Sequence, residues 1–543
     1  MSNLIIRRIS CLEKVFPDRM PSSGAAPLEG LAGECISFQF ALYLEGDRGE
    51  RVKITAKGEG AAVSLRQVSL VPCEYPAHPH FDGDYLDTAP GLYPDLLEEI
   101  PHVGVALAPG QWKGIWVELS LPEQAEGRDV SLSFSFTLEN GLVLKREAAL
   151  QVIPRVLPPL AIPHTEWLHT DCLANYYDIE VFSEAHWQII EKFIACACKR
   201  GCNMILTPLF TPPLDTAVGG ERRTVQLVEV YKEAGGYRFD FQKLERWVNL
   251  CLGLGIRYFE MSHLFSQWGA VSTPKIVARE GGKACRLFGW ETQAGSREYR
   301  AFLGAFLPVL KEKLRELGIE KQVFFHISDE PKLEQLPSYR EACQMVAEEL
   351  REYPIIDALS DFAFYKEGLV KNPVCAIDHM EPFLEAGVDN LWTYYCTGQG
   401  RDVTNRFIAM PGSRTRILGL MLYKFNIKGF LHWGFNFYNS QYSLESLDPF
   451  RHTDAKNAFP SGDPFLVYPG RDGCPLESMR LMYMEQAMND YRLCRLLERL
   501  AGREAVMECI EFDGLHLGLK DYPRGISYLE TVRQKLHKKL MFL

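Results

Sequence analysis

The chain has 543 residues, 47% of them hydrophobic and 24% charged, which are the proportions of a soluble globular protein with roughly two to four domains. The formal net charge of −11 argues against nucleic acid or an anionic membrane as the main partner. No run approaches the ~20 apolar residues of a membrane span, and residues 1–20 lack the apolar core of a secretory signal. We therefore expect a cytoplasmic protein, and its fifteen mostly scattered cysteines suit reduced thiols.

Residues 1–151 show the period-two alternation of half-buried strands, most clearly at 35–43, 114–120 and 130–136, and no convincing helix. This pattern predicts an antiparallel β-sandwich domain. Its loop at 78–97 carries Asp82, Asp84 and Asp87, which favour a polar loop held against the neighbouring domain over a cation site. Residues 152–162 contain three prolines and indicate a stiff connector.

Strand and helix patterns alternate from residue 163 to residue 500. Strands are predicted near 165–170, 203–209, 256–265, 323–331, 354–360, 374–378, 390–396 and 429–437, and helices at 184–199, 241–254, 297–317, 338–352 and 477–500. Gly235 and Gly236 predict a hairpin in an insertion. Eight strands, most with room for an intervening helix, predict a (β/α)8 barrel domain, with a helical tail at 501–543.

The fourth of these strands stops on two adjacent carboxylates, Asp329 and Glu330, followed by Pro331. Glycoside hydrolysis needs a proton donor and a group that stabilises charge at the anomeric carbon, and two carboxylates are the usual means. Neighbours on a regular strand point to opposite faces, so the pair can share a site only if the strand bulges or ends there. The alternative is structural, with Asp329 capping a turn and Glu330 in a salt bridge.

Polar and aromatic residues also mark the ends of other predicted barrel strands. Each alone could belong to the core, but together at one barrel rim they predict a sugar pocket. Trp392 and Tyr394 are two residues apart and therefore project to one face of their strand. The predicted substrate-binding residues are His263, Trp392, Tyr394, Trp433, Asn436 and Tyr438.

Several motifs together resemble one known family. They are HISDEP at 326–331, LWTYY at 391–395, GFLHWGFN at 429–436, DPFLVYPG at 463–470, SMR at 478–480 and DY at 490–491. In combination they resemble the catalytic domain of glycoside hydrolase family 123, and PGLYPD at 90–95 resembles a feature of its sandwich domain. The resemblance covers most of the chain and implies an N-terminal β-sandwich, a distorted (β/α)8 barrel and β-N-acetylgalactosaminidase activity.

The resemblance further implies a retaining, substrate-assisted mechanism on a terminal β-linked N-acetylhexosamine. The 2-acetamido carbonyl of the substrate would attack the anomeric carbon, Asp329 would orient the acetamido group, and Glu330 would act as general acid and then as general base. Trp392, Tyr394 and Trp433 would surround the acetamido group and the ring. The expected partner is a small oligosaccharide or glycoconjugate.

Two other functions stay open from the sequence. One is a conventional two-carboxylate glycosidase, in which Glu330 works with a carboxylate on another strand such as Asp378, and the other is a carbohydrate-binding protein without turnover. A metal-dependent hydrolase is disfavoured because the only histidines close in sequence, His78 and His80, lie in the sandwich loop. No cofactor or metal is expected, and the oligomeric state is not predicted.

Overall fold

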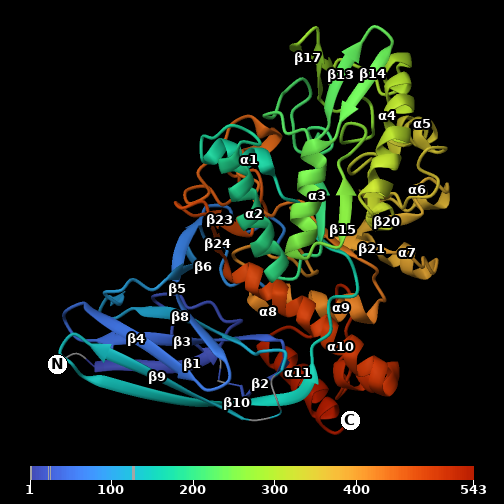
Figure 1. Cartoon of the computed structure of the whole chain (residues 1–543). Coiled ribbons are helices and arrows are strands. Elements are labelled where there is room, and N and C mark those ends of the chain that lie inside the picture. The colour runs from blue at the N-terminus through green and yellow to red at the C-terminus, as the bar shows by residue number, and fades with distance from the viewer. Residues whose placement is uncertain (1–2, 23, 25, 125–126, 128) are drawn as a thin grey trace.

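The structure is a computed structural model that describes residues 3–22, 24, 26–124, 127 and 129–543. Its N-terminal part, blue to cyan in Figure 1, consists of two five-stranded sheets. One has the order β1 (Asn3–Ser10), β3 (Cys35–Glu45), β8 (Trp112–Ser120), β5 (Ala62–Cys73), β6 (Gly91–Glu99). The other has the order β2 (Leu28–Ala32), β10 (Val143–Val156), β9 (Val130–Leu138), β4 (Glu50–Gly58), β7 (Val105–Leu107).

The period-two pattern predicted these sheets because one face of each is buried. Phe38 and Phe40 of β3 meet Phe134 of β9 edge to face, with ring centroids 5.8 and 5.0 Å apart, so the two sheets pack face to face. Neighbouring strands are antiparallel, as predicted, except that β10 runs parallel to β2.

The second part contains eight parallel strands in one sheet. In chain order they are β11 (His164–Glu166), β12 (Met204–Thr207), β15 (Tyr258–Met261), β18 (Val323–Phe325), β19 (Ile356–Leu359), β20 (Asn372–Ala376), β21 (Trp392–Tyr394) and β22 (Phe430–His432). A bridge between Phe325 and Ile355 joins β18 to β19 and brings the sheet close to a closed barrel. Each predicted strand overlaps one of these. The strand predicted at 165–170 is wrong at its end, because Thr170 begins a helix, and the strand predicted at 374–378 begins two residues earlier, at Asn372.

The helices between the strands are of unequal length. They are α1 (Thr170–Tyr176), α2 (Glu184–Lys199), α3 (Gln242–Leu254), α4 (Arg297–Glu316), α5 (Leu336–Val346), α6 (Ala363–Lys366), α7 (Glu381–Glu385), α8 (Gly412–Arg416) and α9 (Leu418–Lys424). Short 3-10 turns lie at Glu320–Gln322, Leu333–Gln335, Ile377–His379 and Gln441–Ser443. Helix α2 begins as predicted, because the side chain of Ser183 accepts a hydrogen bond from the His186 backbone N–H. Beyond β19 and β20 the helices shrink to about one turn, which distorts the barrel.

Insertions and a C-terminal extension surround the barrel. The predicted hairpin, β13 (Glu229–Glu233) with β14 (Gly236–Asp240), joins β16 (Ile276–Glu280) and β17 (Lys283–Phe288) in a four-stranded sheet. The chain ends with the ribbon β23 (Val467–Pro469) and β24 (Pro475–Glu477), α10 (Met479–Ile510) and α11 (Ile526–Met541). Helix α10 runs ten residues beyond the prediction of 477–500, through a kink at Gly502, where φ is 84°.

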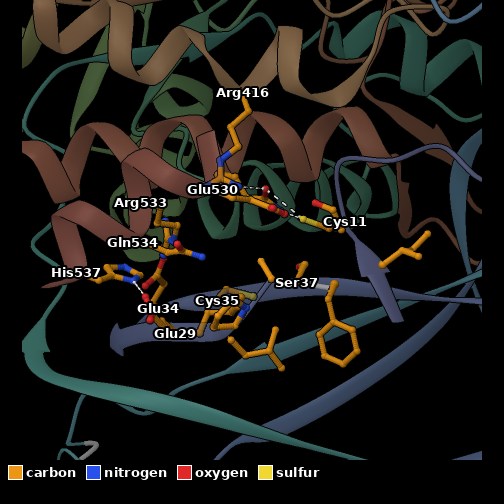
Figure 2. A pocket seen from close by; sticks show the side chains of 18 of the residues that line it. Cys11, Glu29, Glu34, Cys35, Ser37, Arg416, Glu530, Arg533, Gln534 and His537 are labelled. Atoms are coloured by element: carbon orange, nitrogen blue, oxygen red, sulfur yellow. Dashed lines mark hydrogen bonds and ion pairs between the residues drawn. The ribbon is translucent and has the colours of Figure 1, made fainter. Parts of the chain in front are cut away.

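Helix α11 packs against the N-terminal sheets, beside a cavity of about 90 Å³ (Figure 2). The ring of His537 lies 3.0 Å from a carboxylate oxygen of Glu29, and Arg533 pairs with Glu34. Arg533 also pairs with Asp490 of α10. These contacts hold the last helix of the chain to the first sheets.

Buried arginines join the N-terminal sheets to the barrel. Arg200, at the end of α2, contacts Glu118 on β8 at 2.9 Å, Glu477 on β24 at 2.6 Å and Glu485 on α10 at 2.8 Å. Its side chain is 1% exposed. Arg66 also pairs with Glu118 and Glu477, whereas among the described residues only Arg200 pairs with Glu485.

The loop that carries three aspartates is held by a second arginine. Both carboxylate oxygens of Asp82 accept hydrogen bonds from Arg414 of α8 at 2.8 Å, and one also accepts from the Asp402 backbone N–H. This is the polar contact with the neighbouring domain that the sequence favoured. Within the described part of the chain, no helix is both long enough and apolar enough to span a membrane.

We predict that Arg200→Gln destabilises the chain by about 3 kcal/mol or more, because it leaves the buried Glu485 without its cation and leaves Arg66 as the one arginine that binds Glu118 and Glu477 among the described residues. The matched control is Arg246→Gln, which removes a solvent-exposed pair with Glu184. It should lower the free energy of unfolding by about 1 kcal/mol or less. Urea unfolding followed by fluorescence measures both variants. Equal midpoints for the two variants would contradict the role of Arg200.

Candidate active site

The pair Asp329 and Glu330 lies beyond the end of its strand. Strand β18 stops at Phe325. The backbone of the pair itself is held by hydrogen bonds from Trp268 N–H to the Asp329 carbonyl at 2.8 Å and from Glu330 N–H to the Ala358 carbonyl at 3.1 Å. Glu330 has a left-handed φ of 41°. The period-two alternation has therefore ended, and both carboxylates enter one cavity.

The cavity has a volume of about 250 Å³ and lies at the carboxyl ends of the barrel strands. In a parallel barrel this is the end that carries active sites. Its lining residues are Trp167, Leu214, Asp215, Gln267, Trp268, Asp329, Glu330, Ala358, Tyr394, Cys396, Thr397, Leu431, Trp433, Gln441, Tyr442 and Phe459. Three carboxylates, from Asp215, Asp329 and Glu330, and several aromatic rings thus surround the cavity.

The carboxyl group of Glu330 has neutral hydrogen-bond donors around it. The Tyr394 hydroxyl donates to Oε1 at 2.6 Å, and the Cys396 sulfur lies 3.9 Å from the same oxygen. Burial raises the pKa of Glu330, and these two donors together with Lys332 only partly oppose that rise. The group is therefore suited to hold a proton at higher pH than an ordinary glutamate does.

Burial and the adjacent charge of Glu330 raise the pKa of Asp329 well above its usual value. The positive charge of His326 acts in the opposite direction and favours the ionised form of Asp329. Two neighbouring carboxyls in one buried site disfavour each other's ionisation, so the pair retains a proton that isolated acids would have lost.

A buried charge cluster lies beneath the pair. His326 directs Nε2 at Glu260, 2.5 Å away, and Nδ1 at Asp357, 3.1 Å away. Burial lowers the pKa of His326, but the two carboxylates outweigh it and raise the pKa to about 9. The imidazole is therefore a cation at neutral pH. It sits three residues before Asp329, where its charge reaches the cavity.

His263 belongs to this cluster and does not line the cavity. Its ring stacks on that of His326, with centroids 4.3 Å apart, and burial followed by the charge of His326 lowers its pKa well below the usual value. His263, His326 and Asp357 could by distance hold a metal ion. However, Asp357 already accepts hydrogen bonds from the Ile327 backbone and the Tyr339 hydroxyl, and both nitrogens of His326 face carboxylates. The cluster is thus better explained as a compensated set of charges.

Of the six predicted substrate-binding residues, only Tyr394 and Trp433 line the cavity. Trp392 shares its strand face with Tyr394, as predicted, but it lies in a deeper layer of the barrel interior, where it packs against Phe324. Asn436 is buried and binds the backbone N–H and carbonyl of His169.

Tyr438 is likewise outside the cavity lining. Its hydroxyl donates to the Val467 carbonyl at 2.8 Å, which holds the ribbon β23–β24 to the barrel. The alternative partner carboxylate, Asp378, is also not among the lining residues, and it contacts His379 and Gln399 instead.

The sequence patterns missed several lining residues, because these lie on loops between elements. Asp215, Trp268 and Tyr442 have left-handed φ angles of 37°, 57° and 60°, as Glu330 does. Left-handed residues other than glycine are strained by ~1–3 kcal/mol and cluster at functional sites. The Tyr442 backbone N–H donates to Asp215 at 3.0 Å, and its ring meets that of Trp268 edge to face. Burial raises the pKa of Asp215 to about 6.

The position of Trp433 depends on a contact from the N-terminal sheets. Its indole N–H donates to Asp463 at 3.0 Å. Arg480 holds that loop by donating to the Gly462 and Phe465 carbonyls, and Arg480 is itself bound by Asp95 of β6 at 2.9 Å. The conformation of an aromatic wall of the cavity is thus fixed across the domain interface.

A nearly closed parallel barrel with a carboxylate pair at the carboxyl ends of its strands defines a glycosidase-like site. The family model described as glycoside hydrolase 123, catalytic domain, matches residues 167–497. The chain therefore belongs to glycoside hydrolase family 123 and carries its catalytic domain.

One solved structure supports the fold. A family 123 glycoside hydrolase from Clostridium perfringens, studied for glycolipid glycan hydrolysis, has a TM-score of 0.73 at 14% identity, over 99% of this chain and 97% of that one. A β-D-glucuronidase from Dictyoglomus thermophilum aligns over 87% of this chain and 72% of the glucuronidase chain. Its sequence identity is 10% and its TM-score is only 0.32. No curated protein matches this sequence.

We predict that His326 makes stability depend on pH. Its pKa is raised from 6.5 to about 9. The stabilisation that the charged imidazole gives the folded chain is therefore complete below pH 6.5 and is lost as the pH rises toward 9, a total of roughly 3 kcal/mol in the free energy of unfolding. Thermal unfolding from pH 6.5 to 9 should show this decline in the wild type and a shallower one in His326→Gln. The control is His186→Gln: burial lowers the pKa of this histidine below its usual value, so it gains no charge above pH 6.5 and its variant should keep the wild-type slope. Parallel slopes for the wild type and His326→Gln would show that His326 is not the buried cation.

Proposed function

We propose that this chain is a retaining exo-glycoside hydrolase that releases a terminal β-linked N-acetylhexosamine, with N-acetylgalactosamine as the sugar, by a substrate-assisted mechanism. The observation that carries the proposal is the meeting of Asp329 and Glu330 in one small cavity, with Glu330 bound to Tyr394. Adjacent residues suit a mechanism in which the substrate supplies the nucleophile, because no enzyme carboxylate has to attack from across the sugar.

In the first step, the acetamido carbonyl oxygen bonds to the anomeric carbon while the bond to the leaving oxygen breaks and Glu330 gives that oxygen its proton. Asp329 accepts a hydrogen bond from the acetamido N–H and stabilises the oxazolinium charge. In the second step, Glu330 takes a proton from water, and the water oxygen bonds to the anomeric carbon. The bond from that carbon to the acetamido oxygen breaks, which opens the oxazolinium ring and restores the acetamido group. Because each step inverts this carbon, the overall result is retention.

The size and walls of the cavity support an exo mode of action on one sugar. A volume of about 250 Å³ is below the ~300–1,000 Å³ of pockets that bury drug-sized ligands. Trp167, Trp268 and Trp433 offer apolar ring faces to the C–H groups of a pyranose. The described glycolipid glycan hydrolysis of the Clostridium perfringens protein agrees with a glycoconjugate as the substrate here.

A second candidate function is a conventional two-carboxylate glycosidase that acts on a sugar without an acetamido group. The observation that favours it is Asp215, which lines the same cavity from another loop and has a pKa raised to about 6. In that case Asp215, rather than Asp378, would work with Glu330.

We predict that Glu330→Gln lowers kcat/KM for an aryl β-N-acetylgalactosaminide by ~10²–10⁴-fold, because it removes the proton donor. The variant should unfold at the same temperature as the wild type or a higher one at pH 8, because burial disfavours the charge of this carboxylate. Asp378→Asn, outside the cavity lining, is the matched control and should keep near-normal turnover. Near-normal turnover by Glu330→Gln would exclude its role as the acid.

We predict that the wild type hydrolyses an aryl β-N-acetylgalactosaminide at least ~100-fold faster than the matching aryl β-galactoside, because only the first carries the nucleophile. Asp329→Asn should lose most of the rate on the first substrate, whereas Asp215→Asn should retain more of it. Equal rates on the two sugars, with Asp215→Asn the more damaging change, would instead support the two-carboxylate mechanism.

A further inference from the structure

Three metal-ligand side chains meet outside the barrel cavity, where the loop at 448–463 lies against the end of β5. They are Glu74, just after β5, and His452 and Asp454 in the loop. One ligand atom from each lies within 4.8 Å of the other two. We propose that these residues bind a divalent transition-metal cation of the Zn²⁺ class, which fastens the loop to the N-terminal sheets.

Two of the three ligands, His452 and Asp454, have buried polar atoms without a hydrogen-bond partner, whereas Glu74 is exposed. Asp454 is 0% exposed, and neither of its carboxylate oxygens makes a hydrogen bond of good geometry, although the backbone N–H groups of Asn457 and Asp454 lie near enough to favour its charge. Nδ1 of His452 is also buried without a partner. Among the described residues no lysine or arginine pairs with Glu74 or Asp454, and Lys456 binds Glu445 instead. A buried carboxylate beside a second one therefore lacks a compensating cation.

The ligand set selects the class of metal. Two carboxylates and one imidazole match the oxygen and nitrogen ligands that Zn²⁺ accepts, with water in the remaining position. Ca²⁺ takes six to eight oxygen ligands, which three residues with one nitrogen donor do not provide. A bound dication would neutralise both carboxylates and use the free imidazole nitrogen.

Flanking contacts already hold the ligands near each other. On the sheet side, Pro72 and Tyr75 accept hydrogen bonds through their carbonyls, from the Thr453 hydroxyl at 2.6 Å and from the Ser461 backbone at 2.7 Å. Glu74 lies between these two anchor points in the sequence. Little rearrangement would be needed for the metal to bind, which favours affinity.

The loop also reaches the barrel cavity. Phe459 lines that cavity and packs against Trp433, with ring centroids 5.3 Å apart. The metal would touch none of the reacting atoms, so its role is structural: it would stabilise the contact between the sheets and the loop behind Trp433.

The test is a titration of the chelator-treated full chain with Zn²⁺, followed by calorimetry and by bound metal after gel filtration. We expect one equivalent per chain and a higher unfolding temperature. Glu74→Gln and His452→Gln should each weaken binding by at least about tenfold and remove the temperature shift. The matched control His80→Gln, an exposed histidine of the neighbouring loop, should bind Zn²⁺ like the wild type.

Fifteen free thiols offer other places for Zn²⁺, so the type of ligand is tested separately with Co²⁺. The expected Co²⁺ spectrum lacks the thiolate charge-transfer band. In metal-free protein, Asp454→Asn should unfold at the same temperature as the wild type or a higher one, because it removes a buried charge, and it should not respond to Zn²⁺. Absence of stoichiometric binding, wild-type binding by both Glu74→Gln and His452→Gln, or a thiolate band would overturn the proposal.

Discussion

Two adjacent residues can bring their carboxylates into one cavity only where the strand that carries them has ended, and the barrel of this chain depends on that constraint. Strand β18 is three residues long, and the backbone then turns through the left-handed conformation of Glu330. Hydrogen bonds with Trp268, on the loop after β15, and with Ala358 of β19 offset the strain. A longer strand would be more regular but would direct Asp329 and Glu330 to opposite faces.

The site also brings several carboxylates together, and the buried His326 cation partly compensates their negative charge. His326 is held as a cation between Glu260 and Asp357, and its charge acts on Asp329. This cation favours an ionised Asp329, while burial keeps a proton on the pair. Across the domain interface, the contact of Asp95 with Arg480 fixes the loop that orients Trp433. The sandwich-domain motif at 90–95 and the barrel motifs are therefore parts of one structural unit.

Periodicity predicted most elements because their buried faces are regular, and helix α2 has the predicted bounds of 184–199. The carboxylate pair was predictable because it follows an apolar strand. Trp392 shows the limit: the pattern gives the face of a strand but not the depth within the barrel, so a core residue resembled a ligand. Asp215 and Tyr442 could not be predicted, because a contact between distant loops brings them together.

Binding of a thiazoline derived from N-acetylgalactosamine, a mimic of the oxazolinium intermediate, tests the central claim most directly. Calorimetry on the full chain should show tight binding by the wild type, because the site is complementary to the intermediate that Asp329 stabilises. The account predicts at least about tenfold weaker binding by Asp329→Asn, with Asp378→Asn unchanged. No binding by the wild type, or equal affinity for wild type and Asp329→Asn, would contradict it.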